Sequence, residues 1–101
     1  MALIFIHFKF NFMFIRVNHN ISNPQEFWGR AQKALPNLPA GIKLHASYPN
    51  DTMNDATCIW EAADIKTLTD YLEPAVGDVS KNAYMAINAT NAMGLPTAAT
   101  N

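Results

Sequence analysis

Two stretches with helical periodicity, each lying between stretches that alternate like strands, constrain the fold of this chain more than any other feature. The first covers residues 22–35 and opens with Asn23, a favoured N-cap residue, and Pro24, which suits the first helical position. The second opens with Asp64 as its cap, and we expect Pro74 to end it because proline lacks the N–H that continues a helix. The pattern therefore predicts two amphipathic helices.

Four strands are predicted around these helices. The first begins at Met13, and the others cover residues 42–48, 56–62 and 83–88. The apolar face of the second strand is expected to comprise Ile42, Leu44, Ala46 and Tyr48. The order strand, helix, strand, strand, helix, strand predicts an α+β, ferredoxin-like β-α-β-β-α-β fold. In such a fold an antiparallel four-stranded sheet carries two helices on one face.

The apolar segment at the start of the chain has two interpretations. Its apolar residues share one parity up to Phe14 and the opposite parity from Met13 to Val17, and a strand cannot change its buried face without a bulge or break. Either residues 2–10 form an extra strand, or the domain begins at Met13, which we favour because the rest makes a complete fold. We divide the chain into an N-terminal extension or extra strand (1–12), a ferredoxin-like domain (13–96) and a polar tail (97–101).

Composition and charge exclude several classes of protein. Half of the 101 residues are hydrophobic and 15% are charged, which predicts a single globular domain. A net charge of -1 offers no positive field for a phosphate backbone, so we expect no nucleic-acid binding. Polar residues interrupt the apolar start, so we expect neither a signal peptide nor a membrane span. The single cysteine, Cys58, cannot form an internal disulfide, which fits a cytoplasmic protein.

The predicted sheet has one face that no helix covers. Left bare, a face of this size would be a large exposed apolar patch. A second copy placed face to face would cover it around a two-fold axis, with side chains or a small cavity between the sheets. We therefore expect a homodimer.

Two stretches resemble a known group of proteins. They are EFWGRAQKALPNLPAGIKLHASYP and CIWEAADIKTLTDYLEPAVGDVSKNAYMAINATNAMGLP, in which WEA, YLEP and GDVSKN are the most specific motifs. Over residues 13–96 the chain resembles small uncharacterised bacterial proteins of the dimeric α/β-barrel, ferredoxin-like superfamily. The resemblance implies the fold and a dimer. That superfamily includes cofactor-free monooxygenases, haem-degrading enzymes, stress-induced proteins and proteins without an assigned role. No catalytic motif of any of these groups is visible in the chain, so none is carried over.

His45 and Glu61 are the candidate catalytic residues. His45 alternates with Leu44 and is therefore expected to point toward a dimer cavity, where an imidazole can exchange a proton near neutral pH. Glu61, on the adjoining strand, could orient the imidazole or act as a base. In the alternative interpretation, which the residue pattern favours, His45 is an ordinary sheet histidine and Glu61 a strand-end carboxylate facing water.

Five further residues are candidate ligand contacts. Asn18 and His19 are expected where the first strand meets its loop, at the edge of any cavity. The alternative, which the residue pattern favours, is that they are loop residues facing water. Trp28 and Trp60 lie on apolar stripes, so each is a core residue or a stacking platform, and Tyr84 could support His45. We expect no metal site, since no ligand spacing of the H-x-x-x-H kind is present, and we predict no cofactor.

Three functions remain open at this point. The first is a dimeric module that binds a small, largely apolar molecule in an inter-sheet or helix-sheet cavity, as the aromatic content and scarcity of charge indicate. The second is a cofactor-free monooxygenase- or isomerase-like enzyme with His45 as general base. The third is a purely structural role. Neither the ligand nor the reaction follows from the residues.

Overall fold

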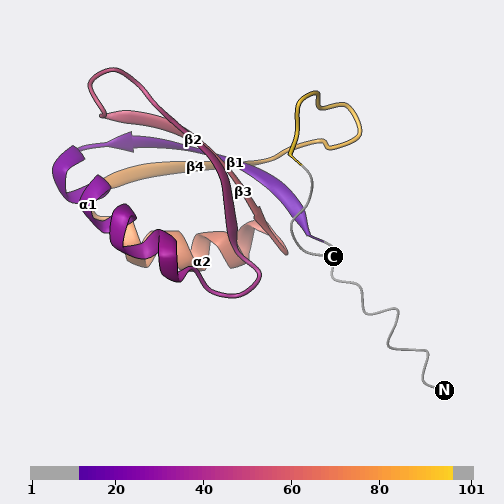
Figure 1. Ribbon diagram of the computed structural model, residues 1–101, viewed down its shortest axis with the longest axis horizontal. Coiled ribbons are helices and arrows are strands. Elements are labelled where there is room, and N and C mark those ends of the chain that lie inside the picture. Colours follow the sequence, from indigo (N-terminus) through magenta and orange to yellow (C-terminus); the bar gives the residue numbers. More distant parts are fainter. Residues whose placement is uncertain (1–11, 97–101) are drawn as a thin grey trace.

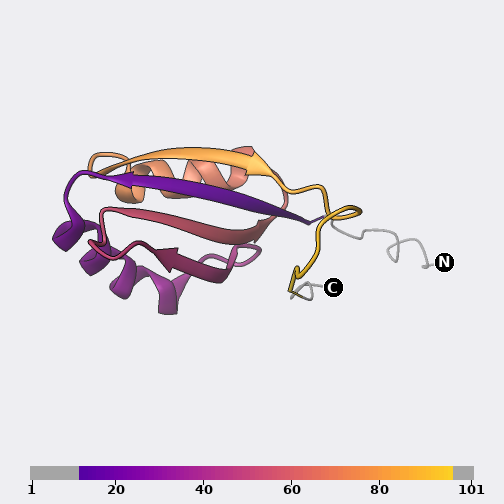
Figure 2. The ribbon, with the colours of Figure 1, turned by 90° about the horizontal axis from the view of Figure 1, so that it is seen from above.

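The computed structural model describes residues 12–96, which form a four-stranded antiparallel sheet with two helices on one face (Figures 1 and 2). The elements in chain order are β1 (Met13–Ile21), α1 (Pro24–Ala34), a short 3-10 helix (Leu35–Asn37), β2 (Lys43–Pro49), β3 (Asp55–Ala62), α2 (Ile65–Val76) and β4 (Ser80–Ala86). The strands lie in the order β2-β3-β1-β4. The predicted α+β, ferredoxin-like fold is therefore confirmed for this part of the chain.

Both helices begin at the predicted caps. The Asn23 side chain accepts a hydrogen bond from the Glu26 backbone N–H at 3.1 Å, and the Asp64 side chain accepts one from the Thr67 N–H at 2.7 Å. Each cap satisfies a backbone donor that a helix start leaves without a partner. The two amphipathic helices predicted from the sequence therefore form where their start signals stand.

The prediction that Pro74 ends the second helix is wrong, because α2 continues to Val76. Proline lacks the N–H that would bond the carbonyl four residues earlier, so α2 continues past Pro74 with that one hydrogen bond missing. Val76 is only 6% exposed and belongs to the core, and the Gly77 N–H donates to the Glu73 carbonyl at 2.8 Å. Burial of Val76 therefore favours continuing the helix for two residues beyond Pro74.

The core lies between the central strands and the two helices. Ile15 and Val17 of β1 are fully buried and pair across the ladder with Trp60 and Cys58 of β3. Leu68 of α2 is also fully buried and packs in the same cluster. Burial on this scale is the main source of stability in a domain of this size.

A bulge at His45 changes the faces of β2. Leu44 pairs with Trp60 and Ala46 with Ile59, so His45 is the extra residue. Beyond the bulge, Ala46 and Tyr48 lie on the face without helices, and Tyr48 is 66% exposed. The prediction that Ile42, Leu44, Ala46 and Tyr48 share one apolar face is therefore wrong, since an inserted residue inverts the alternation of all that follow.

The described residues, 12–96, include both ends of the predicted domain. β1 starts at Met13, as predicted, and β4 starts at Ser80, three residues earlier than predicted, because buried Ser80 pairs with Ile21. The predictions for residues 1–11 and 97–101 concern parts of the chain outside the described residues. Between residues 12 and 96, no helix has the length and apolar character that crossing a membrane requires.

Candidate functional site

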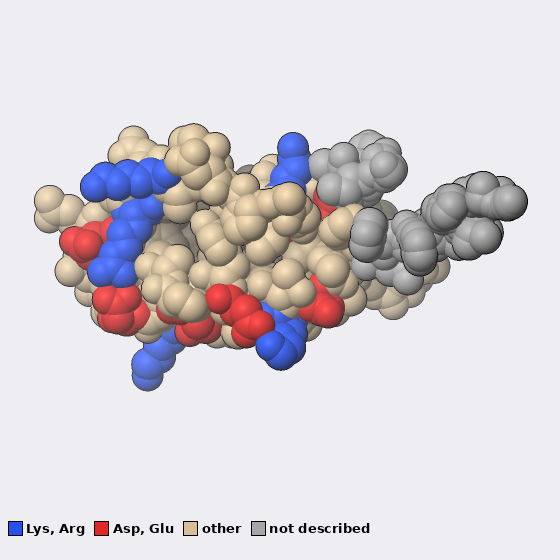
Figure 3. Space-filling view, turned by 90° about the horizontal axis from the view of Figure 1, so that it is seen from below, with Lys and Arg blue, Asp and Glu red and all other residues tan. Residues whose placement is uncertain are grey.

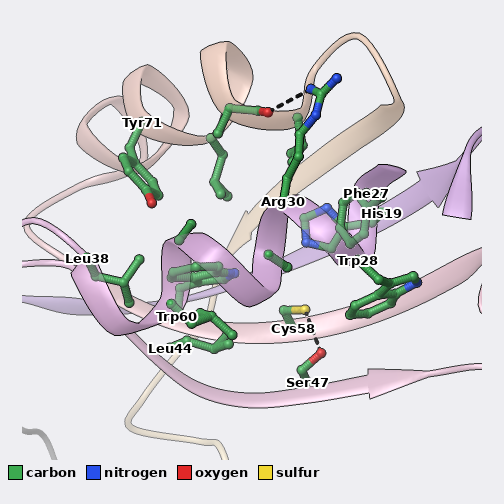
Figure 4. A pocket seen from close by; sticks show the side chains of 16 residues that line it. His19, Phe27, Trp28, Arg30, Leu38, Leu44, Ser47, Cys58, Trp60 and Tyr71 are labelled. Carbon is green, nitrogen blue, oxygen red and sulfur yellow. Dashed lines mark hydrogen bonds between the residues drawn. The ribbon is translucent and has the colours of Figure 1, made fainter. Parts of the chain in front are cut away.

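A pocket with a volume of about 120 Å³ lies between the two helices and the sheet (Figure 4). Its walls are largely apolar and come from both helices and the sheet. The side chains that line it include Phe27, Trp28 and Ala31 of α1, Tyr71 and Leu72 of α2, and Cys58 and Trp60 of β3. On the face that carries the helices, charged side chains gather at one end and along one edge, leaving the middle uncharged (Figure 3). The pocket thus suits an apolar molecule.

Trp28 is held at one end of the pocket by the turn between β2 and β3. Its indole N–H donates to the Met53 carbonyl at 2.9 Å, and its ring meets that of Phe27 edge to face at 4.8 Å. Met53 adopts a φ of 64°, in the left-handed region that non-glycine residues seldom occupy. The turn therefore orients its carbonyl toward α1 and fixes Trp28 as a rigid wall.

His19 lies inside β1 on the helix side of the sheet and is 2% exposed. The prediction that it sits where the strand meets its loop is therefore corrected. Its Nδ1 is 2.6 Å from Asn82 Oδ1, and the Asn82 amide donates to Glu73 at 2.9 Å. Because the Asn82 oxygen accepts, Nδ1 of His19 carries the hydrogen. Burial lowers the pKa of His19, so the imidazole at the pocket wall is neutral.

The lowered pKa of His19 predicts a loss of stability in acid. An unfolded His19 takes up a proton as the pH falls through 6.5, whereas the folded side chain resists protonation, so the free energy of unfolding should decrease there. His19→Asn keeps a donor toward Asn82 and should remove this part of the slope. Urea unfolding of both proteins across this pH range measures it, and identical slopes would contradict the assignment.

Cys58 is a buried thiol in the middle of β3. Burial raises the pKa of this thiol, and its Sγ–H donates to Ser47 Oγ at 3.4 Å. A protonated, buried sulfur is a poor nucleophile. Cys58 therefore acts as a small apolar part of the pocket wall, with Ser47 brought beside it by the bulge at His45.

Trp60 forms the pocket wall near the C-terminal end of β3. His19 of β1 lies beside the opposite end of that strand. The side chain is buried, with 5% exposure, and its indole N–H has no hydrogen-bond partner within the described part of the chain. Figure 4 shows the indole beneath α1, with its nitrogen on the side toward Cys58. A buried donor without a partner is rare in folded proteins and calls for an explanation.

His45 and Glu61 form a second cluster, on the face of the sheet that no helix covers. His45 Nε2 lies 2.7 Å from Glu61 Oε1, and the two side chains are 7% and 1% exposed. The Phe14 ring packs against the imidazole at a centroid distance of 5.3 Å. The structure thus brings the two predicted catalytic residues together, and the alternative of a water-facing Glu61 is wrong.

The remaining predicted ligand contacts lie elsewhere. Asn18 is on the helix-free face, where its side chain accepts a hydrogen bond from the Thr57 hydroxyl at 2.9 Å. Tyr84 is on the helix side and donates to Glu73 at 2.6 Å, so it does not reach His45. Sequence reasoning missed Ser47, because nothing in the residue pattern marks the bulge. No cluster of three metal-binding side chains occurs among residues 12–96.

Comparisons of the chain with models of protein families, with curated proteins and with solved structures found no match. The resemblance to the dimeric α/β-barrel superfamily therefore stays a prediction, and the two clusters have to be interpreted from their own chemistry.

Proposed function

We propose that this protein binds a small apolar molecule in the pocket between its helices and its sheet. The observation that supports this is a largely apolar cavity of about 120 Å³ with two tryptophans, Trp28 and Trp60, in its walls. An apolar cavity of about 150 Å³ is large enough to bind benzene. The expected ligand is therefore about the size of one six-membered ring.

Filling the pocket should abolish binding and stabilise the fold. Ala31 lies on the pocket side of α1, and Ala31→Leu would place an isopropyl group in the cavity. We expect the free energy of unfolding to rise by about 1 kcal/mol. Benzene, which should raise the melting temperature of the wild type through binding to the folded state, should then have no effect.

The matched control is Gln32→Leu, one residue further along α1 and exposed to solvent. It introduces the same side chain outside the pocket, so the benzene response should persist. If Ala31→Leu kept the full benzene response, or if benzene stabilised neither the wild type nor the control, the pocket would not be the binding site.

The second candidate function is catalysis with His45 as general base. The observation that favours it is the 2.7 Å contact between His45 Nε2 and Glu61 Oε1, with both side chains buried. A carboxylate that accepts from one imidazole nitrogen orients the ring, as in enzymes that use histidine to move a proton. Comparing the stability of His45→Ala with that of His45→Leu/Glu61→Leu tests whether the pair serves function or folding.

We further propose that the helix-free face of the sheet pairs with the same face of a second copy. Tyr48 and Met85 on this face are 66% and 45% exposed, and half-buried Ile59 lies between their strands. Sedimentation velocity should give twice the mass of one chain. Tyr48→Glu should shift the protein to the monomer, because a charge would be buried at the interface.

The control for the dimer is Met93→Glu, which adds the same charge at a side chain that is 95% exposed and outside the sheet. This variant should remain dimeric. A wild-type protein that sediments as a single chain at all concentrations tested would overturn the pairing.

A further inference from the structure

The helix-free face of the sheet carries a cation near its middle. Arg16 lies on the inner strand β1, where it pairs with Ile59 of β3 on one side and with Met85 of β4 on the other (Figure 2). Arg16 is exposed, and its guanidinium has no ion pair or hydrogen bond in the described part of the chain. The cation thus lies between apolar neighbours, on the surface that the proposed dimer would bury.

Burial of this guanidinium against a second copy requires an acid. A charge that leaves water without an opposite partner is strongly destabilised. Contact between the Arg16 side chains of the two copies would add repulsion between like charges. The acid that binds Arg16 must therefore come from the same face of the second copy.

Two acidic residues, Asp55 and Glu61, lie on this face within residues 12–96. Glu61 is 1% exposed, and its carboxylate already lies 2.7 Å from His45 Nε2. Asp55 is exposed at the start of β3, and alternation with the buried Ala56 places it on the helix-free face. Within the described residues its carboxylate has no ion pair or hydrogen bond. Asp55 is therefore the acid that remains available.

Arg16 and Asp55 of the same chain are too far apart to bind each other. Arg16 lies opposite Ile59, which is four residues from Asp55 along β3, or about 13 Å at the rise of a strand. In a two-fold dimer each contact between two different residues is made twice, once in each direction. A face with one free cation and one free acid is therefore complementary to a second copy of itself.

We infer that Arg16 of each copy binds Asp55 of the other, and that the two-fold axis crosses β1 and β3 at Asn18 and Thr57, midway between the two charges. This inference rests on the proposed dimer, which requires only that the helix-free faces meet. It adds the register of one sheet on the other. Tyr48 pairs with Thr57, so this register brings the Tyr48 side chains of the two copies close together.

Charge reversal at the two positions tests this register. Arg16→Asp should place two acids in each contact, and Asp55→Arg should place two cations there. Contacts between like charges are strongly unfavourable and each occurs twice, so either variant should raise the dissociation constant of the dimer at least about a hundredfold. The double variant Arg16→Asp/Asp55→Arg exchanges the charges and should dimerise like the wild type. Sedimentation equilibrium measures all four proteins.

An equimolar mixture of the two single variants tests whether the residues contact each other. A chain with Arg16→Asp has its complementary charges only on a chain with Asp55→Arg, so the mixture should form heterodimers. Native mass spectrometry separates heterodimers from homodimers by mass. The matched controls are Lys33→Asp and Asp70→Arg, which make the same charge changes at exposed positions of α1 and α2. Both controls should dimerise like the wild type.

The outcomes separate this inference from the proposed dimer. A wild type that sediments as a single chain would overturn the dimer, and this inference with it. If the wild type and both single variants dimerise equally well, the faces meet in another register and only this inference fails. Single variants that remain monomeric after mixing would also overturn it, because the complementary charges would then not lie in contact.

Because both positions are exposed, the variants should keep the fold, which circular dichroism of each protein checks.

Discussion

Replacing His45 by alanine should lower the free energy of unfolding by about 3 kcal/mol, because it removes a buried hydrogen-bond partner and leaves a cavity in place of a packed ring. Its side chain is 7% exposed and lies 2.7 Å from Glu61, which is 1% exposed. The substitution deprives the buried carboxylate of this donor and removes the ring that packs against Phe14. Denaturant unfolding of the wild type and the variant measures the loss. The dependence of the free energy of unfolding on denaturant concentration should be the same in both proteins.

The control is Asp70→Ala, which breaks the Lys66–Asp70 pair of 2.6 Å on the exposed surface of α2. Because solvent screens that pair, the free energy of unfolding should change little. A loss no larger for His45→Ala than for Asp70→Ala would contradict the buried contact.

The double variant His45→Leu/Glu61→Leu tests what the pair is for. A buried hydrogen-bonded or ionic pair can often be replaced by apolar side chains of similar volume without loss of stability. If the double variant is about as stable as the wild type, folding does not require the pair, which favours the catalytic role of His45. If it is as unstable as His45→Ala, the pair is structural and the second candidate function is lost.

The fold could be predicted because its main signals are local. Asn23 and Asp64 each cap a helix through a side chain three residues from its donor, and such spacing is visible in the sequence. The bulge at His45 could not be predicted, because it depends on how β2 aligns with β3 across the sheet. Because the bulge was not foreseen, the prediction assigned Tyr48 to the wrong face of the sheet. For the same reason Ser47 was not recognised as part of the pocket wall.

The candidate sites were predicted less completely than the fold. Residue types drew attention to His45, Glu61 and Trp60, but partners in space decide what each can do. The contact between His45 and Glu61 follows from their positions on adjacent strands, whereas the uncommitted N–H of Trp60 depends on which acceptors the packed chain leaves within reach. A sequence pattern marks an aromatic residue as buried without showing where its nitrogen points.

Replacing Leu72 by alanine should lower the free energy of unfolding by about 3 kcal/mol and enlarge the pocket. Leu72 of α2 is 5% exposed and belongs to both the core and the pocket wall. The lost isopropyl group leaves space that joins the existing cavity. Isopropylbenzene is larger than benzene by one isopropyl group, so we expect it to be too large for the wild-type pocket. It should bind to the variant and raise the melting temperature of the variant.

Leu68→Ala separates the effect on stability from the effect on the pocket. Leu68 lies one turn earlier on α2 and is fully buried, but it does not line the pocket. We expect a similar loss of stability from the same deletion in the same core. The new space should be closed off from the ligand, so isopropylbenzene should leave this variant unchanged. Equal stabilisation of both variants would mean that any cavity in this core takes the molecule, and the pocket would lose its claim to be a specific site.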